Sequence, residues 1–227
     1  MTVFPNLKNS PFYKLSSKSK LAKLLGCKTK FLHTFRNSRE NYKIYETPKK
    51  NDPTKKRPVE EPKEKLKTLH KKIKKILDRL QYPDYLQSGV KGKSYIDNAK
   101  KHCSSSSYYT VTMDLAGFYQ HGRKSFLAGI LKKDFLILDD IAWLLADIMT
   151  VPSENGKESY FPTGSPISQL VIYLTYKKTF DDIAELAKEK GIIFTLYVDD
   201  MTFSSPHKIS NSFIKTIKQR LRMYNLK

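Results

Sequence analysis

The hydrophobic positions of the chain follow two spacings, one helical and one strand-like. Between residues 62 and 82, apolar side chains recur every three or four positions, which predicts one amphipathic helix with a lysine-rich outer face. Similar spacing predicts further helices over 16–26, 94–102, 123–131, 137–149, 165–190 and 208–224. Runs of β-branched and aromatic residues predict strands over 108–115 and 192–205, and a β-ribbon over 42–61. With a serine-rich turn at 104–107, this mixture predicts an α+β fold.

Composition indicates a folded protein rather than a disordered one. The 227 residues are 39% hydrophobic and 12% aromatic, enough for one or two cores. No apolar run is long enough to span a membrane, and the first residues do not resemble a secretory signal, so we expect a soluble, cytoplasmic protein without membrane partners. Cys27 and Cys103 have no metal-ligand spacing and are interpreted as reduced thiols.

The positive charge is concentrated in the first half of the chain. The whole chain has 42 Lys and Arg against 22 Asp and Glu, a net charge of +20. Residues 1–101 contain 27 of these cations and 9 of the acids, or +18, which leaves 15 against 13, or +2, for residues 102–227. This asymmetry favours a first half that binds a polyanion such as nucleic acid. A lysine-rich surface that only keeps the protein soluble is the simpler alternative.

Three Asp-Asp pairs occur, and only one interrupts an apolar strand. The pairs at 139–140 and 181–182 fall near the start or on the exposed side of predicted helices, where negative charge suits the helix dipole or meets water. Asp199 and Asp200 instead lie inside the predicted strand segment 192–205. The pair therefore falls at, or just beside, the tight turn of a β-hairpin.

Two carboxylates held close together repel, so one takes up a proton unless a cation neutralises them. Mg²⁺ prefers oxygen ligands of this kind. Asp114 ends the predicted strand 108–115, and if the strands are neighbours, it meets Asp199 and Asp200 at one edge of a sheet. That arrangement suits two metal ions about 4 Å apart. A turn-forming Asp pair and an unrelated strand-end Asp fit the spacing equally well.

Five segments, in order along the chain, resemble motifs of the reverse transcriptase family, in particular the bacterial retron-type and defence-associated enzymes. They are RPVEEPKEKLKTLHKKI (57–73), GVKGKSYIDNAKKH (89–102), MDLAGFYQ (113–120), FPTGSPIS (161–168) and YVDD (197–200). One match would be weak, whereas five in the family order are specific. Within the second segment, His102 is either part of the motif or a surface histidine.

The resemblance implies metal-binding roles for the acids. Asp114, Asp199 and Asp200 would bind two catalytic ions, Mg²⁺ or alternatively Mn²⁺, with the Leu115 carbonyl as a further ligand. Tyr119 matches the position whose ring stacks under the sugar and excludes a 2′-hydroxyl. A core aromatic residue is the alternative for Tyr119.

The resemblance also implies residues that bind the nucleotide. Arg57 matches an arginine that clamps the incoming triphosphate, a task that suits a guanidinium, although it could also be a surface charge of the ribbon. Gly164, Ser165 and Pro166 match a turn that lets the backbone approach nucleotide and template, although the same turn could be only a helix start. Thr163 stands where the family usually has Gln, which removes a long amide from this turn.

The fold implied by the resemblance is a polymerase hand. We expect a basic N-terminal and fingers region over 1–105 and an incomplete palm over 106–227, with an antiparallel sheet backed by helices. We expect the thumb to be absent from this chain.

The function implied is RNA-directed DNA synthesis by two-metal nucleotidyl transfer, in a retron-type or antiviral-defence enzyme. Its partners would be an RNA template, a DNA or RNA primer and dNTPs, and a structured non-coding RNA is a further expected partner. Two alternatives stay open: a catalytically inactive nucleic-acid-binding scaffold, and a polymerase that needs no template. The sequence does not define the template, the priming mode or the oligomeric state.

Overall fold

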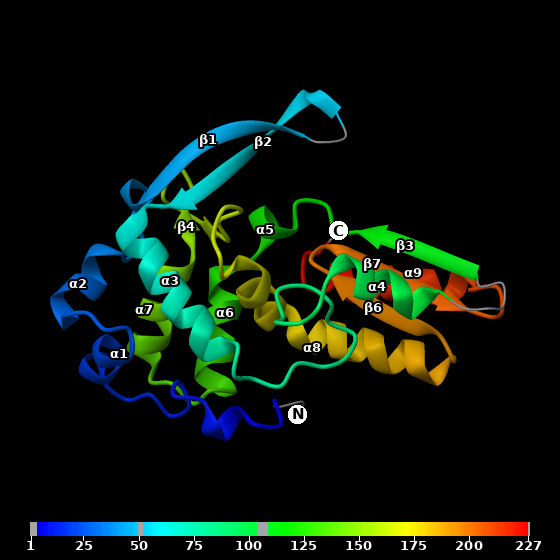
Figure 1. Cartoon of the computed structure of the whole chain (residues 1–227), viewed down its shortest axis with the longest axis horizontal. Coiled ribbons are helices and arrows are strands. Elements are labelled where there is room, and N and C mark those ends of the chain that lie inside the picture. Colours follow the sequence, from blue (N-terminus) through cyan, green and yellow to red (C-terminus); the bar gives the residue numbers. More distant parts are fainter. Residues whose placement is uncertain (1–3, 50–51, 104–108, 227) are drawn as a thin grey trace. The chain divides into compact units, whose positions relative to one another are not determined.

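The protein is described by a computed structural model, which covers residues 4–49, 52–103 and 109–226 (Figure 1). Its contacts form two compact units. We call Met1–Phe4, Gln81–His121 and Tyr176–Lys227 the sheet unit, and Pro5–Leu80 and Gly122–Thr175 the ribbon unit. The two units interleave along the sequence, whereas the expected boundary was a single cut at residue 105. The assignment of a fingers region and a palm stays a proposal.

The sheet unit contains a three-stranded antiparallel sheet in the order β3-β7-β6. Its strands are β3 (Tyr109–Asp114), β6 (Ile193–Tyr197) and β7 (Asp200–Ser205), so both predicted strand segments are confirmed. A short segment extends the outer edge of β6: the Gln87 amide donates to the Leu196 carbonyl at 2.9 Å, and the Leu196 amide donates to the Tyr85 carbonyl at 2.8 Å. β3 forms the other edge of the sheet.

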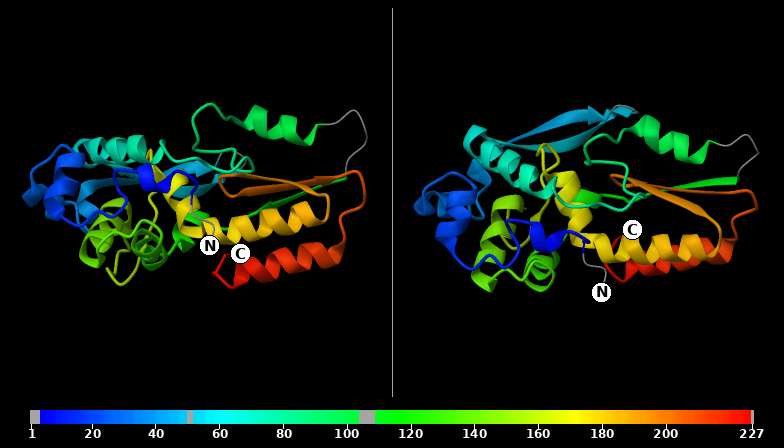
Figure 2. Two further views of the ribbon diagram at one scale, coloured as in Figure 1. Left: turned by 90° about the horizontal axis from the view of Figure 1, so that it is seen from below. Right: turned by 60° about the horizontal axis from the view of Figure 1, so that its bottom comes forward.

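The two faces of this sheet differ in chemistry. Side chains alternate along a strand, so Phe194 and its partner Phe203 share one face, where their rings stack at 5.0 Å and Phe203 meets Phe213 of α9 (Asn211–Arg222). The other face is rich in hydroxyl groups. Figure 2 shows α4 (Tyr95–His102) on one side of the sheet and α9, with the C-terminal part of α8 (Ser168–Glu189), on the other.

α4 is attached to the hydroxyl-rich face through its last residue. The ring nitrogens of His102 lie 2.7 Å from Ser204 Oγ and 2.7 Å from Thr195 Oγ1. Burial lowers the pKa of His102, and the neighbouring Lys101 lowers it further. The alternative of a surface histidine is therefore wrong: His102 joins α4 to β6 and β7.

The ribbon unit is named after its long antiparallel pair, β1 (Tyr42–Lys49) and β2 (Asp52–Pro62), which confirms the predicted ribbon. α3 (Glu64–Leu77) follows β2 and buries its apolar stripe, as predicted, including Leu66 and Ile73. The remaining elements are η1 (Leu7–Asn9), α1 (Lys18–Leu24), α2 (Thr29–Thr34), η2 (Arg39–Asn41), α6 (Lys124–Lys133), α7 (Asp139–Met149), β4 (Val151–Pro152), β5 (Ser159–Tyr160) and the first turns of α8.

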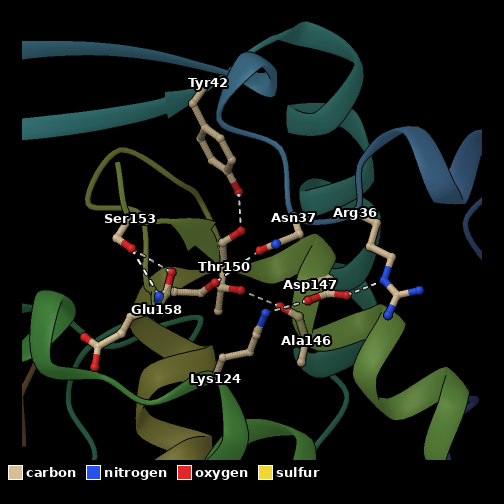
Figure 3. A network of polar contacts seen from close by, with 10 residues as sticks. Arg36, Asn37, Tyr42, Lys124, Ala146, Asp147, Thr150, Ser153 and Glu158 are labelled. Atoms are coloured by element: carbon tan, nitrogen blue, oxygen red, sulfur yellow. Dashed lines mark hydrogen bonds and ion pairs between the residues drawn. The ribbon is translucent and has the colours of Figure 1, made fainter. Parts of the chain in front are cut away.

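A buried carboxylate of α7 joins this helix to the start of α6 and to the turn that follows α2 (Figure 3). Asp147 of α7 is 4% exposed, and it accepts hydrogen bonds from Arg36 Nε at 2.6 Å and from Lys124 Nζ at 2.8 Å. Thr150, which follows α7, donates to the Ala146 carbonyl, and the Tyr42 hydroxyl donates to the Thr150 carbonyl at 3.3 Å. Because both oxygens of Asp147 have cationic partners, its charge is compensated where water cannot reach it.

Capping residues mark several of the helix ends. Ser17, Ser94 and Ser210 accept hydrogen bonds from backbone amides in the first turns of α1, α4 and α9. Gly26 and Gly191 have positive φ and follow the ends of α1 and α8. Short elements were missed, namely α2, α5 (Phe118–His121) and the hairpin β4–β5, because few residues define them.

The predicted environment of one acidic pair is corrected by the structure. Asp139 and Asp140 do begin α7 as expected. Asp181, however, is 8% exposed in the middle of α8 rather than on its exposed side. It is paired with Lys177 Nζ at 2.5 Å and accepts a hydrogen bond from the Tyr85 hydroxyl at 2.6 Å, which explains why a charge is tolerated there.

Three further expectations concern features outside these elements. The predicted turn at 104–107 lies outside the described residues. Cys27 and Cys103 are both free thiols. Among the helices of the described part of the chain, none combines the length and the apolar character that crossing a membrane requires.

Candidate active site

The structure brings Asp114 and Asp200 directly opposite each other. They are the last pair in the β3–β7 register, so their side chains share the hydroxyl-rich face of the sheet. Directly opposed residues of antiparallel strands have Cβ atoms about 5 Å apart, and like charges in that position destabilise the pair. Both residues are exposed. The sequence-based expectation that β3 and the hairpin would be neighbours is thus confirmed.

Asp199 lies in the turn beside this pair. Tyr197 pairs with Asp200, so Val198 and Asp199 are the two central residues of the hairpin turn between β6 and β7. The Leu115 amide donates to the Asp199 carbonyl at 3.0 Å, which joins the turn to the end of β3. Three acids that are far apart in the sequence therefore meet at one end of the sheet.

The turn contains a strained residue. Val198 has a φ of 58°, a conformation that a β-branched residue rarely adopts and that costs about 1–3 kcal/mol. Its amide donates to Ser88 Oγ at 2.7 Å, and Ser88 is only 5% exposed. A two-residue hairpin turn of this kind needs a positive φ at its first central position. Ser88 thus holds the turn in the conformation that places Asp199.

The electrostatics of the three acids reflect their crowding. Burial raises the pKa of Asp199, and the charges of Asp114 and Asp200 raise it further. Burial and the charge of Asp114 raise the pKa of Asp200. Among the described residues, no Lys, Arg or His forms an ion pair with any of the three. Within the described part of the chain, no ion pair therefore neutralises the negative charge of the cluster.

The chemistry of the cluster suits a hard cation, although its side chains are not yet gathered around one point. The side chains of the cluster offer carboxylate oxygens, which are the ligands that Mg²⁺ prefers. In the described ranges 4–49, 52–103 and 109–226, however, no group of three or more His, Cys, Asp and Glu side chains stands in a metal-binding arrangement. A bound ion would have to draw the three carboxylates together by side-chain rotation.

Two other predicted residues lie at this end of the sheet unit. The charge of Asp199 acts on the hydroxyl of Tyr119, whose pKa is raised mainly by burial and secondarily by that charge. Leu115 is buried and, with Asp114, lines a cavity of about 680 Å³. Lys218 and Arg222 of α9 line the same cavity, so two cations and one of the three acids, Asp114, line one space there.

The remaining predicted residues belong to the ribbon unit. Arg57 lies on β2, opposite Thr47, and its Nε is 3.4 Å from Thr47 Oγ1. Gly164 lies against the same strand: its amide donates to the Glu60 carbonyl at 3.2 Å, and a Cβ atom at this position would be 2.9 Å from that oxygen. Gly164 is therefore needed for close backbone packing, and the turn that contains it contacts the strand that carries Arg57.

Thr163, which replaces the usual Gln, fastens this turn to the ribbon. Its amide donates to Glu60 Oε2 at 3.0 Å. Its hydroxyl lies 3.0 Å from the same carboxylate and 3.1 Å from the Pro58 carbonyl, so it can donate to either. A threonine here bonds to the protein itself, which gives the substitution a structural reason.

Ser165 and Pro166 complete the turn. The Ser165 hydroxyl lies 2.7 Å from Nδ1 of the fully buried His70, whose Nε2 lies 2.8 Å from the Ile148 carbonyl. Since a carbonyl only accepts, Nε2 carries the proton and Ser165 donates to Nδ1. The side chain of Ser165 thus points into the ribbon unit. Pro166 lies at an intermediate level of exposure.

Sequence reasoning missed Ser88 and Glu60. Each acts on a turn about a hundred residues away, since Ser88 and Val198 are 110 positions apart and Glu60 and Thr163 are 103. Ser88 precedes a glycine and resembles any loop residue. Glu60 stands in an alternating ribbon where an acid is expected to face water. No local pattern in the sequence pointed to either contact.

Comparisons with known proteins agree with the geometry. A family model described as "Reverse transcriptase (RNA-dependent DNA polymerase)" matches residues 47–227. The "Retron Se72 reverse transcriptase" of Salmonella heidelberg (strain 579083-10) is 28% identical over 76% of this chain and 45% of its own length. The "Retron Ec48 reverse transcriptase" of Escherichia coli is 30% identical over 56% of this chain and 29% of its own length. The chain spans about half the length, or less, of these curated relatives.

Proposed function

Because the chain belongs to the reverse transcriptase family, we propose that it carries the catalytic acids of an RNA-directed DNA polymerase of the bacterial retron type. The observation that carries the proposal is the placement of Asp114 opposite Asp200, beside Asp199. A role in antiviral defence is proposed from the resemblance alone.

The proposed reaction is nucleotidyl transfer. The 3′-hydroxyl of a primer attacks the α-phosphate of a dNTP, and pyrophosphate leaves. Two Mg²⁺ ions, or Mn²⁺, would lower the pKa of the attacking hydroxyl and stabilise charge on the leaving group. Asp114, Asp199 and Asp200 would hold these ions, with the Leu115 carbonyl as a further donor. The raised pKa values of Asp199 and Asp200 support this role, because a divalent cation relieves the repulsion that causes part of the shift.

The other residues would position the substrates. Tyr119 lies close enough to Asp199 to respond to its charge, which supports a place for its ring beside the sugar. Arg57 is proposed to bind the triphosphate, and Gly164, Ser165 and Pro166 to lie along nucleotide and template. Contact between their turn and β2 supports a joint role for these residues. An RNA template, a DNA or RNA primer and dNTPs are the proposed substrates.

Primer extension tests the proposal directly. The protein is supplied with an RNA template, an annealed DNA primer, dNTPs and Mg²⁺, and the product is followed on a gel. The double variant Asp199→Asn, Asp200→Asn should lose extension by a factor of at least about 10³. Asp139→Asn, Asp140→Asn is a matched control, since it neutralises another adjacent pair, at the start of α7. Equal activity of the two variants would refute the metal-binding roles.

Two further outcomes separate the alternatives. Binding of RNA without any Mg²⁺-dependent extension would favour an inactive scaffold. Product formed without added template would favour template-independent synthesis. Metal binding has its own readout: Mg²⁺ should raise the melting temperature of the wild type and of the control, but not that of the Asp199→Asn, Asp200→Asn variant.

A further inference from the structure

A second charged site lies in the ribbon unit, where the C-terminal ends of α1 and α3 meet. It is a cavity of about 390 Å³ with eight lining residues. Four of them are cations and none is acidic: Lys23 from α1, and Lys72, Lys75 and Arg79 from α3 and the turn that follows it. Leu24 and Ile76 form part of its apolar wall. We call this site the cationic pocket.

The cations of this pocket lack acidic partners, unlike their neighbours on the same helix. Lys67 is paired with Glu61, and Lys74 is paired with Asp78, each at 2.7 Å. Within the described part of the chain, none of the four pocket cations forms an ion pair. Since four like charges line one concave surface, the pocket concentrates positive potential and attracts anions.

One of the cations is fixed in place by the backbone. Lys72 Nζ donates to the Leu25 carbonyl at 2.8 Å and lies 3.5 Å from the Gly26 carbonyl. Gly26 has a positive φ, and a Cβ atom there would lie 2.6 Å from Lys72 Nζ, so a glycine makes this approach possible. An ammonium has three protons, and two carbonyls leave one of them for a ligand.

The spacing of the cations fits the phosphates along a nucleic-acid strand better than it fits a single phosphate ion. Lys72 and Lys75 are three residues apart on one face of α3, and Arg79 lines the same pocket from the turn that follows the helix. If the rise of about 1.5 Å per residue is continued through this turn, the three cations cover roughly 10 Å. One strand of a nucleic-acid duplex places a phosphate every 3.4 Å or so along the axis, so this length matches about three phosphates. Arg79 adds a guanidinium, which can bind a phosphate with two hydrogen bonds.

We propose that the cationic pocket binds the sugar–phosphate backbone of an RNA strand, as a nucleic-acid contact additional to the carboxylate site. The choice of RNA rests on the proposed function, whereas the polyanion site rests on the pocket itself. Cations at helix C-termini also complement the helix dipole, which needs no ligand. The two explanations differ in whether RNA affinity depends on these particular side chains.

The test is RNA binding as a function of salt, without dNTPs or Mg²⁺, so that its outcome is independent of polymerase activity. A fluorescein-labelled RNA hairpin is titrated with the full chain between about 50 and 200 mM salt. The variant Lys23→Gln, Lys75→Gln, Arg79→Gln leaves Lys72 and its backbone contacts intact. It should reduce the slope of log K against log[salt] by about 2 to 3 and lower the affinity at least tenfold.

The matched control removes the same charge from other surfaces of the chain. Lys133→Gln, Lys157→Gln, Lys188→Gln changes three exposed lysines on α6, the β4–β5 loop and α8, and should alter the slope by less than about 1. Equal losses in the two variants would overturn the proposal and leave only a general charge effect. If the pocket variant does not fold, as judged by circular dichroism, Arg79→Gln alone should still reduce the slope by about 1.

Competition by inorganic phosphate shows whether the cationic pocket binds an RNA strand or a single small anion. Replacing chloride by phosphate at constant ionic strength should weaken RNA binding equally in the wild type and the pocket variant. Selective competition in the wild type would show that a single phosphate fills the pocket, and would overturn the assignment to an RNA strand.

Discussion

The contact between Ser88 and Val198 gives the sharpest prediction about the candidate active site. Ser88→Ala removes the acceptor of the Val198 amide, a 2.7 Å hydrogen bond at a position where Ser88 is almost completely buried. Leaving a buried donor unpaired costs about 1–3 kcal/mol. Without that bond, the turn can relax away from the positive φ of Val198, since an L-residue gains about 1–2 kcal/mol by leaving the left-handed region. Asp199, the next residue, would then move.

A second substitution should rescue the first. Glycine adopts positive φ about as readily as negative φ, so in Val198→Gly the turn no longer depends on Ser88 to keep its shape. Displacing a catalytic group by about 1 Å can cost on the order of a hundredfold in rate. We therefore expect Ser88→Ala to slow single-nucleotide extension by about 10- to 100-fold, and the double variant Ser88→Ala, Val198→Gly to recover most of that loss.

The extension rate and the free energy of unfolding are both measured for four proteins: the wild type, Ser88→Ala, Val198→Gly and the double variant. Extension of a preformed primer–template is followed under single-turnover conditions, and the free energy of unfolding is obtained from urea titration. Ser210→Ala is the matched control: it removes the cap of α9, which accepts the Phe213 amide at 3.2 Å in the same unit, and it should cost about 1 kcal/mol without affecting the turn. Coupling between Ser88 and Val198 of about 1 kcal/mol is expected in the unfolding cycle. Additive effects, or a rate loss no greater than that of Ser210→Ala, would refute the reasoning.

Three predictions concern the stability of the ribbon unit. Burial lowers the pKa of His70 to about 4, so as the pH falls the unfolded chain binds a proton at this histidine before the folded chain does. The free energy of unfolding should therefore fall by roughly 3 kcal/mol between pH 6.5 and pH 4. In urea titrations, His70→Gln should flatten this pH profile. Asp147→Asn leaves Arg36 and Lys124 without their shared carboxylate and should lower the free energy of unfolding, measured in the same way, by about 2 kcal/mol. A loss below about 0.5 kcal/mol would show that these hydrogen bonds do not stabilise the unit. Gly164→Ala forces a methyl group against the ribbon backbone and should lower stability by about 1–3 kcal/mol, whereas Gly129→Ala, in open space on α6, should raise it by about 0.5–1.

The parts of the site that could be predicted are those with a local signature. Acids that end or interrupt apolar strands are visible in the sequence, and antiparallel pairing of neighbouring strands then brings Asp114 opposite Asp200. The helices were likewise predicted from apolar spacing. The ribbon was visible for the same reason, since its alternation is local.

The parts that could not be predicted depend on contacts between distant segments. Whether Asp181 faces solvent depends on where Tyr85 comes to lie, 96 positions earlier. The positive φ of Val198 depends on the exact length of the turn, because moving it by one residue would place Asp199 on a strand instead. The role of Thr163 depends on Glu60 approaching from the ribbon. In each case the side chain looks ordinary until its partner is known.

The candidate site is unfavourable in itself, and the rest of the sheet unit compensates for it. Opposed like charges cost about 0.2–1 kcal/mol, and the strained turn costs about 1–3. Stacking of Phe194 on Phe203, and the contact of Phe203 with Phe213, stabilise the same hairpin through its other face, where burying each ring contributes roughly 1.5–3 kcal/mol. Because β6 and β7 carry both the apolar face and two of the acids, and β3 brings Asp114 beside them, the packing of the rings can offset the repulsion among the three carboxylates. Weakening the aromatic face should therefore make folding of the sheet unit depend on Mg²⁺, since the ion would then have to supply the stabilisation that the rings supply now.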